Sequence, residues 1–312
     1  MKVLVTGGAG FIGSHVVELL IKSGYEALVV DNFRSGKREF IPPNVRFIDV
    51  DITSPQIEAV FSREKPDVVI HLAAQVDVAY SIQNPVEDAN QNILGTIHLL
   101  ACCHKYNVKK FIFSSSCAVY GEKNDCSIKE TFSIQPQSFY GISKYTSEMY
   151  IQTFSRLFHL PYTILRYANV YGPRQSSKGE GGVISIFFKM MLNGEVPYIF
   201  GDGEQTRDFV YVKDVANANL LSIESGTNGI FNIGTNSKTS INELFQIIKS
   251  LTSSNITPIP MPERDGDIRH SRLDNTNALN LLSWNPVYDL QTGLNETLKY
   301  YKGSVNPGSL KD

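Results

Sequence analysis

The chain opens with a short strand pattern that runs into a glycine-rich turn and then into an amphipathic helix pattern. Lys2 to Thr6 is rich in strand-forming residues, Gly7-Gly-Ala-Gly10-Phe-Ile-Gly13 follows directly, and Ile12 to Ser23 has helical period. Glycine at these places permits a tight turn, close approach of the backbone to a pyrophosphate, and close packing of the helix on the strand. The start of such a helix also offers unpaired N–H groups and a positive dipole to phosphates. Because the glycine pattern lies between a strand and a helix, it favours a parallel α/β sheet with a dinucleotide site for the first part of the chain.

Strand and helix patterns go on alternating through the first half of the chain. This alternation predicts a Rossmann-type, doubly wound parallel sheet with helices on both faces, in which ligands bind beyond the carboxyl ends of the strands. The further strand patterns cover Ala27–Val30, Val45–Ile48, Asp67–Leu72, Lys110–Ser114 and Tyr162–Arg166, and the helix patterns lie near Pro55–Arg63, Pro85–Tyr106 and Tyr140–Phe158.

The pattern loosens after about Gly172. Glycine and proline become frequent there, and helix patterns at Val183–Leu192 and Ile241–Leu251 stand among short strands. We therefore expect a dinucleotide-binding domain at residues 1–172, with a return segment at about 208–235. A smaller α/β domain for the substrate should take up most of residues 173–312, with the cleft between the two.

Composition and charge exclude several classes of partner. Of the 312 residues, 29 are Lys or Arg and 31 are Asp or Glu, so no net field attracts nucleic acid or an anionic membrane. No apolar run approaches the roughly 18 residues of a membrane span, and Met1 leads into a strand rather than a signal peptide. The four cysteines show no metal-ligand spacing, so we expect reduced thiols, no metal site and a cytoplasmic protein.

An acidic residue ends the second strand pattern. Asp31 lies at the distance from the glycine turn at which a carboxylate binds the adenosine ribose hydroxyls. Because the same carboxylate would repel a 2′-phosphate, the sequence favours NAD over NADP. The alternative is that Asp31 is only a turn residue beside Asn32.

Two further strand ends supply candidate cofactor contacts. Asp51 and Ile52 follow the third strand pattern, where they could meet the adenine amino group and ring. Leu72-Ala-Ala-Gln75 ends the fourth pattern with small residues that let the chain pass under the cofactor. His71 precedes that turn and is a candidate acid–base group, but such a strand position points into the core, so we favour a structural histidine.

A phenol and an ammonium group lie four residues apart in one helix pattern. Tyr140 and Lys144 therefore share a helix face. A free tyrosine titrates near ~10 and is a poor base at neutral pH. An adjacent cation favours the phenolate, which could then take a proton from a sugar or alcohol hydroxyl. Taken alone, the pair also fits a solvated helix face.

The motifs resemble one family when they are taken in order. The chain is similar to the NAD-dependent nucleotide-sugar epimerase/dehydratase family of the extended short-chain dehydrogenase/reductases in its glycine turn, Asp31, Asp51, Ser114-Ser-Ser116, Tyr140 and Lys144. The resemblance runs from Met1 to about Tyr300. It implies that Tyr140 is the catalytic base, that Lys144 lowers its pKa and binds the nicotinamide ribose, and that Ser116 hydrogen-bonds the reacting oxygen.

The resemblance also assigns residues to the cofactor. It implies that Ser114 lies on the nicotinamide side, that Asn92 supports its helix and the cofactor pocket, and that Tyr167-Ala-Asn169-Val170 lies where nicotinamide and sugar meet. The alternative for the serine run is a strand end that satisfies its own backbone. The expected NAD contacts are Gly7, Gly10, Phe11, Ile12, Gly13, Asp31, Asn32, Asp51, Ile52, Leu72, Ala73, Ala74, Gln75, Asn92, Ser114, Tyr140, Lys144, Tyr167 and Val170.

The second half of the chain resembles the nucleotide-sugar side of the family. The implied phosphate ligands are Arg207 and Arg264, since a guanidinium fork matches phosphate oxygens; salt bridges are their ordinary alternative. Tyr198 and Phe200 are implied to pack on or pair with uracil. The chain departs from typical members at Gly181-Gly-Val-Ile-Ser185, which leaves the contacts there open. The expected UDP-sugar contacts are Ser116, Asn169, Val183, Tyr198, Phe200, Arg207, Arg264, Asp267 and Ser271.

The implied reaction is transient oxidation of a sugar carbinol by NAD⁺. We expect a UDP-sugar 4-epimerase, an isomerase in which a 4-keto sugar turns over and the hydrogen returns to its other face. A 4,6-dehydratase of this family usually has Asp-Glu where this chain has Cys117-Ala118, so dehydration is disfavoured. A UDP-glucuronate 4-epimerase or decarboxylase stays open, and so does an NAD-binding sensor without catalysis.

Two residues and two helices bear on the substrate and the assembly. Ser271 aligns with a family position beside the sugar's 2-substituent, where a small residue leaves room for an N-acetyl group. The acetylated sugars UDP-GlcNAc and UDP-GalNAc are therefore expected substrates, with UDP-Glc and UDP-Gal as further ones, unless Ser271 merely ends a strand. Cys117 is either a proton donor or, as we favour, a buried inert thiol.

The family commonly pairs through helices that here begin near Pro85 and Tyr140, so we expect a homodimer.

Overall fold

One large sheet organises the first two thirds of the chain. The computed structural model describes residues 1–177, 182–263 and 268–304. All strand pairs of the seven-stranded sheet are parallel, and the strand order is β11-β6-β5-β4-β1-β2-β3. The strands are β1 (Lys2–Thr6), β2 (Glu26–Asp31), β3 (Arg46–Asp49), β4 (Val68–His71), β5 (Lys110–Ser116), β6 (Tyr162–Tyr167) and β11 (Gly229–Ile233).

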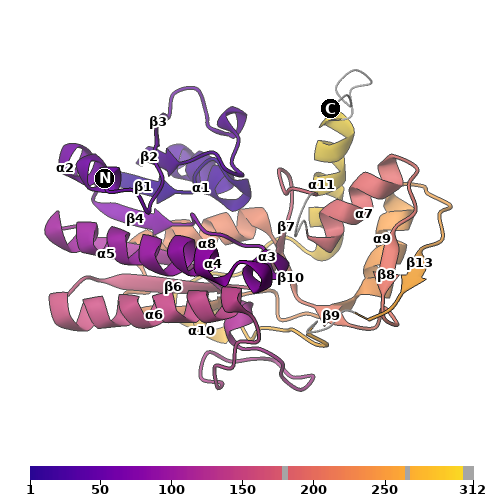
Figure 1. The fold of residues 1–312 in the computed structure, drawn as a ribbon. Coiled ribbons are helices and arrows are strands. Elements are labelled where there is room, and N and C mark those ends of the chain that lie inside the picture. Colours follow the sequence, from indigo (N-terminus) through magenta and orange to yellow (C-terminus); the bar gives the residue numbers. More distant parts are fainter. Residues whose placement is uncertain (178–181, 264–267, 305–312) are drawn as a thin grey trace.

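Helices cover both faces of this sheet (Figure 1). One face carries α1 (Phe11–Lys22), α8 (Val212–Glu224) and α10 (Thr276–Leu281), and the other carries α2 (Gln56–Glu64), α5 (Gly95–Lys105) and α6 (Phe139–Phe158). Each face has its own apolar core, because the strands are buried on both sides and point alternate side chains into the two cores. Short elements follow β4: α3 (Val78–Gln83), α4 (Pro85–Ala89) and a π-helical turn at Asn90–Leu94.

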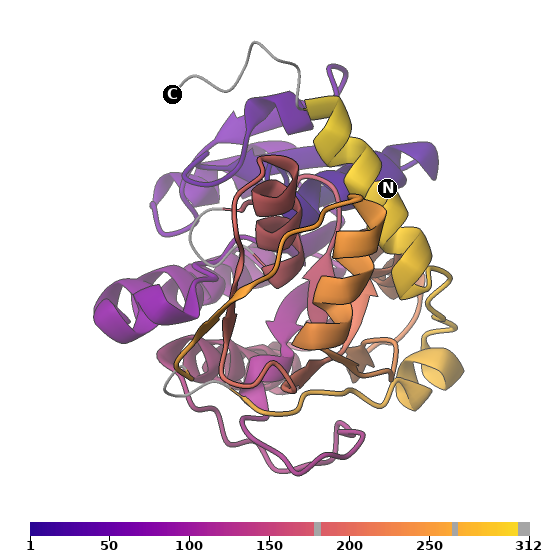
Figure 2. The ribbon, with the colours of Figure 1, turned by 90° about the vertical axis from the view of Figure 1, so that its right-hand side faces the viewer.

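The remaining elements form what we call the C-terminal lobe, seen face-on in Figure 2. Its helices are α7 (Val183–Leu192), α9 (Ile241–Leu251) and α11 (Leu290–Ser304), which enclose a third core around Phe187, Phe188, Phe245 and Leu294. Its strands form three short pairs: β8 (Tyr198–Phe200) with β13 (Ile259–Met261), β9 (Thr206–Arg207) with β12 (Thr239–Ser240), and β7 (Asn169–Tyr171) with β10 (Phe209–Tyr211).

The predicted fold class is confirmed, and several boundaries move. The strand pattern Lys110–Ser114 extends to Ser116, and β3 ends at Asp49, two residues before Asp51. The helix pattern at Pro85–Tyr106 divides into α4, the π turn and α5. Both α8 and β11 come from the predicted return segment and join the large sheet. The division into two domains remains a prediction.

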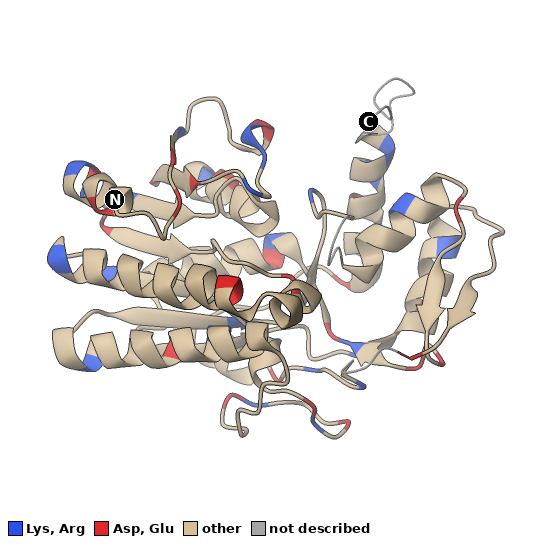
Figure 3. Ribbon diagram, in the orientation of Figure 1, with Lys and Arg blue, Asp and Glu red and all other residues tan. Residues whose placement is uncertain are grey.

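Charge is distributed over both parts of the molecule. In Figure 3, Lys and Arg are interspersed with Asp and Glu along the ribbon of the large sheet and of the C-terminal lobe. Among the residues that the structure describes, no helix has the length and apolar character that crossing a membrane requires.

Candidate functional site

The glycine turn is packed so tightly that side chains cannot fit. Gly7 has φ +70°, and a Cβ there would lie 2.7 Å from the backbone nitrogen of Ala73, at the end of β4. A Cβ on Gly13 would lie 2.1 Å from the carbonyl oxygen of Gly7. Helix α1 follows with Gly10 as its N-cap, without a capping side chain. The turn therefore offers bare backbone and a helix N-terminus, which fits a pyrophosphate.

Asp31 ends β2 beside this turn and is buried. Its carboxylate accepts N–H bonds from Ala9 (2.9 Å) and Phe33 (2.8 Å), so the acid ties the glycine turn to the β2 end. Burial raises the pKa of this carboxyl, while the two N–H bonds oppose the rise. The position of Asp31 fits an acid that binds a ribose. Its bond to the Phe33 N–H is also what the alternative, a turn residue, would make.

The predicted adenine contacts form a separate small cluster. Asn32 donates its amide to Asp51 (2.8 Å), and Asp51 also accepts the backbone N–H and hydroxyl of Thr53 (2.8 and 2.7 Å). Burial opposes ionisation of Asp51, but these hydrogen bonds hold its pKa below the ordinary value. Ile52 is buried against Gly95, where a Cβ would lie 2.6 Å from its terminal carbon atom. The cluster lies just past the ends of β2 and β3.

The segment after β4 is fixed by Asn92, whose side-chain amide makes two hydrogen bonds with the Gln75 backbone. Its oxygen accepts the Gln75 N–H and its nitrogen donates to the Gln75 carbonyl, both at 2.9 Å. Asn92 lies within the π-helical turn, which is how one side chain reaches across to Leu72–Gln75. His71 is structural, as predicted. It lies between the hydroxyls of Thr6 and Thr96 (2.8 and 3.0 Å), and burial lowers its pKa to about 3.

Tyr140 and Lys144 lie one turn apart at the start of α6. The Ser138 hydroxyl caps this helix by accepting the Gly141 N–H (3.1 Å), and Tyr140 N donates to Ser81 (3.2 Å). Lys144 is 3% exposed, its ammonium donates to the Ser114 carbonyl (2.8 Å), and it lies 5.9 Å from the centre of the Tyr140 ring. Burial lowers the Lys144 pKa to about 8. Lys144 is thus buried beside a half-buried Tyr140, unlike a pair on a solvated helix face.

The serine run has two roles at the end of β5. The Ser116 hydroxyl accepts the Ala118 N–H (3.2 Å), so it caps the 3₁₀ turn at Cys117–Val119. This is the alternative role predicted for the serine run, a strand end that satisfies its own backbone. Ser116 is half-buried, and its side chain also makes a hydrogen bond with the Cys117 thiol. The Ser114 carbonyl accepts the hydrogen bond from the Lys144 ammonium group, and Ser116 follows Ser114 by two residues on the same strand.

The Tyr167 side chain is buried, and its hydroxyl bonds to Ser114 as well as to α8. Its hydroxyl exchanges hydrogen bonds with the amide of Asn219 on α8 (2.8 and 3.1 Å), and burial raises the pKa of the phenol. Tyr167 is the last residue of β6, and its ring turns into the core beneath α8. Family resemblance identified the segment but not the direction of this side chain.

Sequence reasoning missed a buried ion pair between α6 and β6. Glu148, one turn after Lys144, is 0% exposed and accepts two hydrogen bonds from Arg166 on β6 (2.9 and 2.6 Å). It also accepts the hydroxyl of Ser115 (2.5 Å), and Arg166 donates to Tyr120 (2.9 Å). The sequence indicates this ion pair only through the spacing of Glu148, four residues after Lys144, which places both on one face of the helix. The pair fixes α6 against β5 and β6.

The predicted substrate residues meet near β7, β9 and the segment before α10. Asn169 has a buried side-chain oxygen without a hydrogen-bond partner among the described residues. Ser271 is buried, and its N–H donates to the carbonyl of Thr206, next to Arg207 (3.2 Å). Arg207 itself donates to that Thr206 carbonyl (3.0 Å). These residues lie close together although the sequence separates them widely.

The other predicted substrate residues are more peripheral or outside the described part. Tyr198 on β8 is 47% exposed, with Phe200 two residues on along the same strand, and Val183 is the first residue of α7. Arg264 and Asp267 lie outside the described residues.

Cys117 lies between the catalytic and the substrate residues. Burial raises the pKa of its thiol, while hydrogen bonds with Ser271 and Ser116 and the charge of Arg207 oppose the rise. A thiol with a raised pKa is largely protonated at neutral pH and a weak nucleophile. This agrees with the inert role that we favoured.

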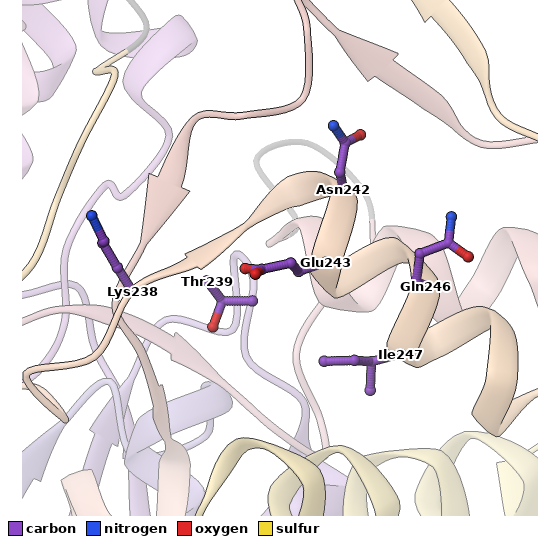
Figure 4. Close-up of a pocket in the computed structure, with 6 residues that line it drawn as sticks. All are labelled: Lys238, Thr239, Asn242, Glu243, Gln246 and Ile247. Carbon is purple, nitrogen blue, oxygen red and sulfur yellow. The ribbon is translucent and has the colours of Figure 1, made fainter.

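A surface hollow in the C-terminal lobe is a separate feature. Figure 4 shows it beside β12 and the first turns of α9. Glu243 in this hollow accepts the Ser240 N–H (2.8 Å) as part of a capping box, and Lys238 pairs with Asp125. These charged groups are engaged within the protein. The lining residues are Lys238, Thr239, Asn242, Glu243, Gln246 and Ile247, none of which sequence reasoning assigned to the site.

Comparison with known proteins agrees with this geometry. The model of the NAD dependent epimerase/dehydratase family matches residues 3–234. The chain belongs to this family. The predicted family, and NAD as its cofactor, are thus confirmed. The tight glycine turn and Asp31 fit that cofactor independently, since both follow from backbone geometry in this chain.

Three solved structures resemble the chain over nearly all of its length. A UDP-glucose 4-epimerase of Thermotoga maritima with UDP-glucose is 49% identical, with a TM-score of 0.96, over 98% of this chain and 100% of that one. A UDP-N-acetylglucosamine 4-epimerase of Methanobrevibacter ruminantium, in complex with UDP-N-acetylmuramic acid, is 41% identical, with a TM-score of 0.93, over 97% and 98%. A UDP-glucuronic acid 4-epimerase of Bacillus cereus is 31% identical, with a TM-score of 0.89, over 97% and 100%.

Proposed function

We propose that this protein is an NAD-dependent UDP-sugar 4-epimerase. The single observation that carries the proposal is the buried Lys144 beside Tyr140, held by the Ser114 carbonyl two residues before Ser116. The three residues combine a base, its cation and a hydroxyl donor at the end of the strand next to β4. Relatives that act on UDP-glucose, UDP-N-acetylglucosamine and UDP-glucuronic acid share the C4 inversion that their names state.

The glycine turn, Asp31 and the ends of β3 and β4 are the proposed residues that hold NAD. NAD⁺, when bound, would supply a reversible hydride acceptor for the sugar's C4. Helix α1 would bind the pyrophosphate through its free N–H groups, and Asp31 would accept hydrogen bonds from the ribose hydroxyls. Asn92 keeps the Gln75 backbone in place under the cofactor.

Tyr140 removes and returns the proton of the sugar hydroxyl. Lys144 favours the phenolate as long as it is charged, which its pKa of about 8 allows at neutral pH. Ser116 donates its O–H to the sugar oxygen while that oxygen becomes a carbonyl. These steps move one proton in each direction, so the site ends each turnover in its starting state.

Arg207 and Asn169 are the proposed ligands on the nucleotide-sugar side. The unpartnered Asn169 oxygen is a buried acceptor, which is costly unless a ligand donor meets it. Ser271 is small and buried beside Cys117, which supports space for an N-acetyl group. The preferred substrates are therefore UDP-GlcNAc and UDP-GalNAc, with UDP-Glc and UDP-Gal as further substrates.

A uronate substrate is the second candidate, because one similar structure is a UDP-glucuronic acid 4-epimerase. The decisive experiment incubates the purified protein with UDP-glucose, UDP-GlcNAc and UDP-glucuronate and identifies the products by NMR. C4-inverted UDP-GlcNAc supports the proposal. Inversion of UDP-glucuronate alone favours the uronate epimerase, release of CO₂ favours a decarboxylase, and no product from any substrate favours a non-catalytic NAD sensor.

We further propose a homodimer. A stripe of exposed apolar side chains runs along α6 at helical spacing, with Ile142, Met149 and Leu157 at 45%, 52% and 61% exposure. Leu94, 47% exposed, extends it onto the neighbouring π turn. Sedimentation should show a dimer that Met149→Glu splits, whereas Leu281→Glu, on exposed α10, should leave it intact. A wild-type monomer would contradict the proposal.

A further inference from the structure

Asp208 is a buried carboxylate at the junction between the large sheet and the C-terminal lobe. It lies between β9 and β10, close to where β7 and β10 connect the two parts in Figure 1. Its exposed fraction is 0%. A buried carboxylate is costly unless several donors satisfy it, so its contacts show what the charge holds in place.

Four neutral donors reach the two carboxylate oxygens. One oxygen accepts the N–H (2.9 Å) and hydroxyl (2.6 Å) of Thr235, and the other accepts the N–H groups of Asn236 (3.2 Å) and Leu273 (3.1 Å). The backbone of Gly234 is pressed against the acid, since a Cβ there would lie 2.5 Å from a carboxylate oxygen. One side chain therefore gathers the turn after β11 and the segment before α10.

Asp208 links its own segment, which carries Arg207, to the segment before α10, which carries Ser271. Arg207 precedes it directly, and Ser271 lies two residues before Leu273. The Asp208 carbonyl accepts the backbone N–H of Asn169 (2.9 Å). Cys117, which contacts Ser271, also lies within the electrostatic reach of Asp208. The acid thus lies at the centre of the substrate side without being directed at a ligand.

We propose that Asp208 is a positioning residue for substrate selection, whose carboxylate fixes Ser271 relative to Arg207. It therefore sets how well the site distinguishes acetylated from plain UDP-sugars. The inference rests on the proposed UDP-sugar function. An amide at this position would turn its NH₂ group toward a backbone N–H and release one of the two segments. Asp208→Asn should therefore loosen the substrate pocket without changing the affinity for NAD.

The test compares Asp208→Asn with Asp214→Asn. Asp214 is a matched control because it too is buried (2% exposed) and accepts two backbone N–H groups, from Val287 and Tyr288. Loss of hydrogen bonds to a charged group should raise the KM for UDP-sugars by about tenfold or more in Asp208→Asn. The ratio of kcat/KM for UDP-GlcNAc to that for UDP-glucose should change as well, while NAD affinity stays at the wild-type value.

A milder variant keeps the proposal testable if Asp208→Asn does not fold. Thr235→Val removes the hydroxyl donor but leaves the backbone N–H, so it should shift the same ratio in the same direction by a smaller factor. An unchanged ratio in Thr235→Val and in any folded Asp208→Asn, or a shift no larger than in Asp214→Asn, would overturn the proposal.

Failure of the proposed function would be recognised separately. If the wild-type protein turns over none of the UDP-sugars, the proposed function fails, and calorimetric titration with UDP then tests Asp208 alone. Weaker UDP binding in Asp208→Asn or Thr235→Val than in Asp214→Asn would support a positioning role next to Arg207. Equal binding in the three variants would refute it.

Discussion

The catalytic side and the substrate side of the site are built in opposite ways. On the catalytic side, long strands and α6 enclose Lys144, Glu148 and Arg166, which are at most 3% exposed and are each hydrogen-bonded within the protein. On the substrate side, strands of two or three residues carry an exposed Tyr198 and an Asn169 oxygen without a partner. On this side, the Asp208 carboxylate joins the turn after β11 to the segment before α10.

This difference agrees with what a 4-epimerase must do. The base, cation and hydroxyl must stay in one geometry, because proton transfer depends on distances of a hydrogen bond. The keto sugar must turn over in the site, so its contacts cannot be equally rigid. We infer that the catalytic side is preorganised and that the substrate side completes its hydrogen bonds only with ligand.

The largest expected effect is loss of the base on the rigid side. Tyr140→Phe removes the proton acceptor and should lower kcat by about 10²–10⁴-fold, while leaving UDP affinity near the wild-type value. Product formation by NMR and UDP titration measure the two quantities. A variant that keeps wild-type turnover would assign the chemistry to another group.

The two sides should also differ in the stability cost of losing an ion pair. Arg166→Met leaves the buried Glu148 charge without its partner and should lower the free energy of unfolding by about 3–5 kcal/mol. Arg269→Met breaks an exposed bidentate pair with Asp202 in the C-terminal lobe and should leave that free energy nearly unchanged. Urea unfolding of both variants provides the comparison, and equal losses would remove the distinction.

Cofactor choice should depend on Asp31. Asp31→Asn removes the charge that accepts ribose hydroxyls and repels a 2′-phosphate, so NAD affinity should fall by about tenfold or more while NADP affinity rises. Asp49→Asn is the control, because Asp49 is an exposed acid at the end of the neighbouring strand. Calorimetric titration of cofactor-free protein measures both affinities. Unchanged selectivity would leave Asp31 as a turn residue.

The smallest effect concerns pH. The folded-state pKa of Lys144 is about 8, below its ordinary value of 10.5, so the ammonium that favours the phenolate is present below pH 8 and lost above it. Activity should therefore fall as pH rises through about 8, and Lys144→Arg should lose this decline because arginine stays charged. Lys110 is matched in burial and in a pKa of about 8, yet it lies at the opposite end of β5. Lys110→Met should keep the wild-type profile, and disappearance of the decline in that variant would contradict the assignment.

Much of the catalytic side could be predicted because its signals are local. The glycine turn precedes α1 directly, and Tyr140 and Lys144 lie on one helix, where spacing fixes their shared face. The direction of Tyr167 could not be predicted, since the packing of α8 on the strand end decides it. The role of Asp208 was missed for a similar reason: its partners Thr235 and Leu273 lie 27 and 65 residues away.

The most direct test of the central claim follows the hydrogen on C4. The protein is incubated in D₂O with UDP-GlcNAc and, separately, with UDP-glucose, and the products are analysed by proton NMR and mass spectrometry. Transient oxidation within one closed site predicts a C4-inverted product that keeps its original hydrogen at C4. A product with deuterium at C4, or the absence of inversion with both sugars, would contradict the account.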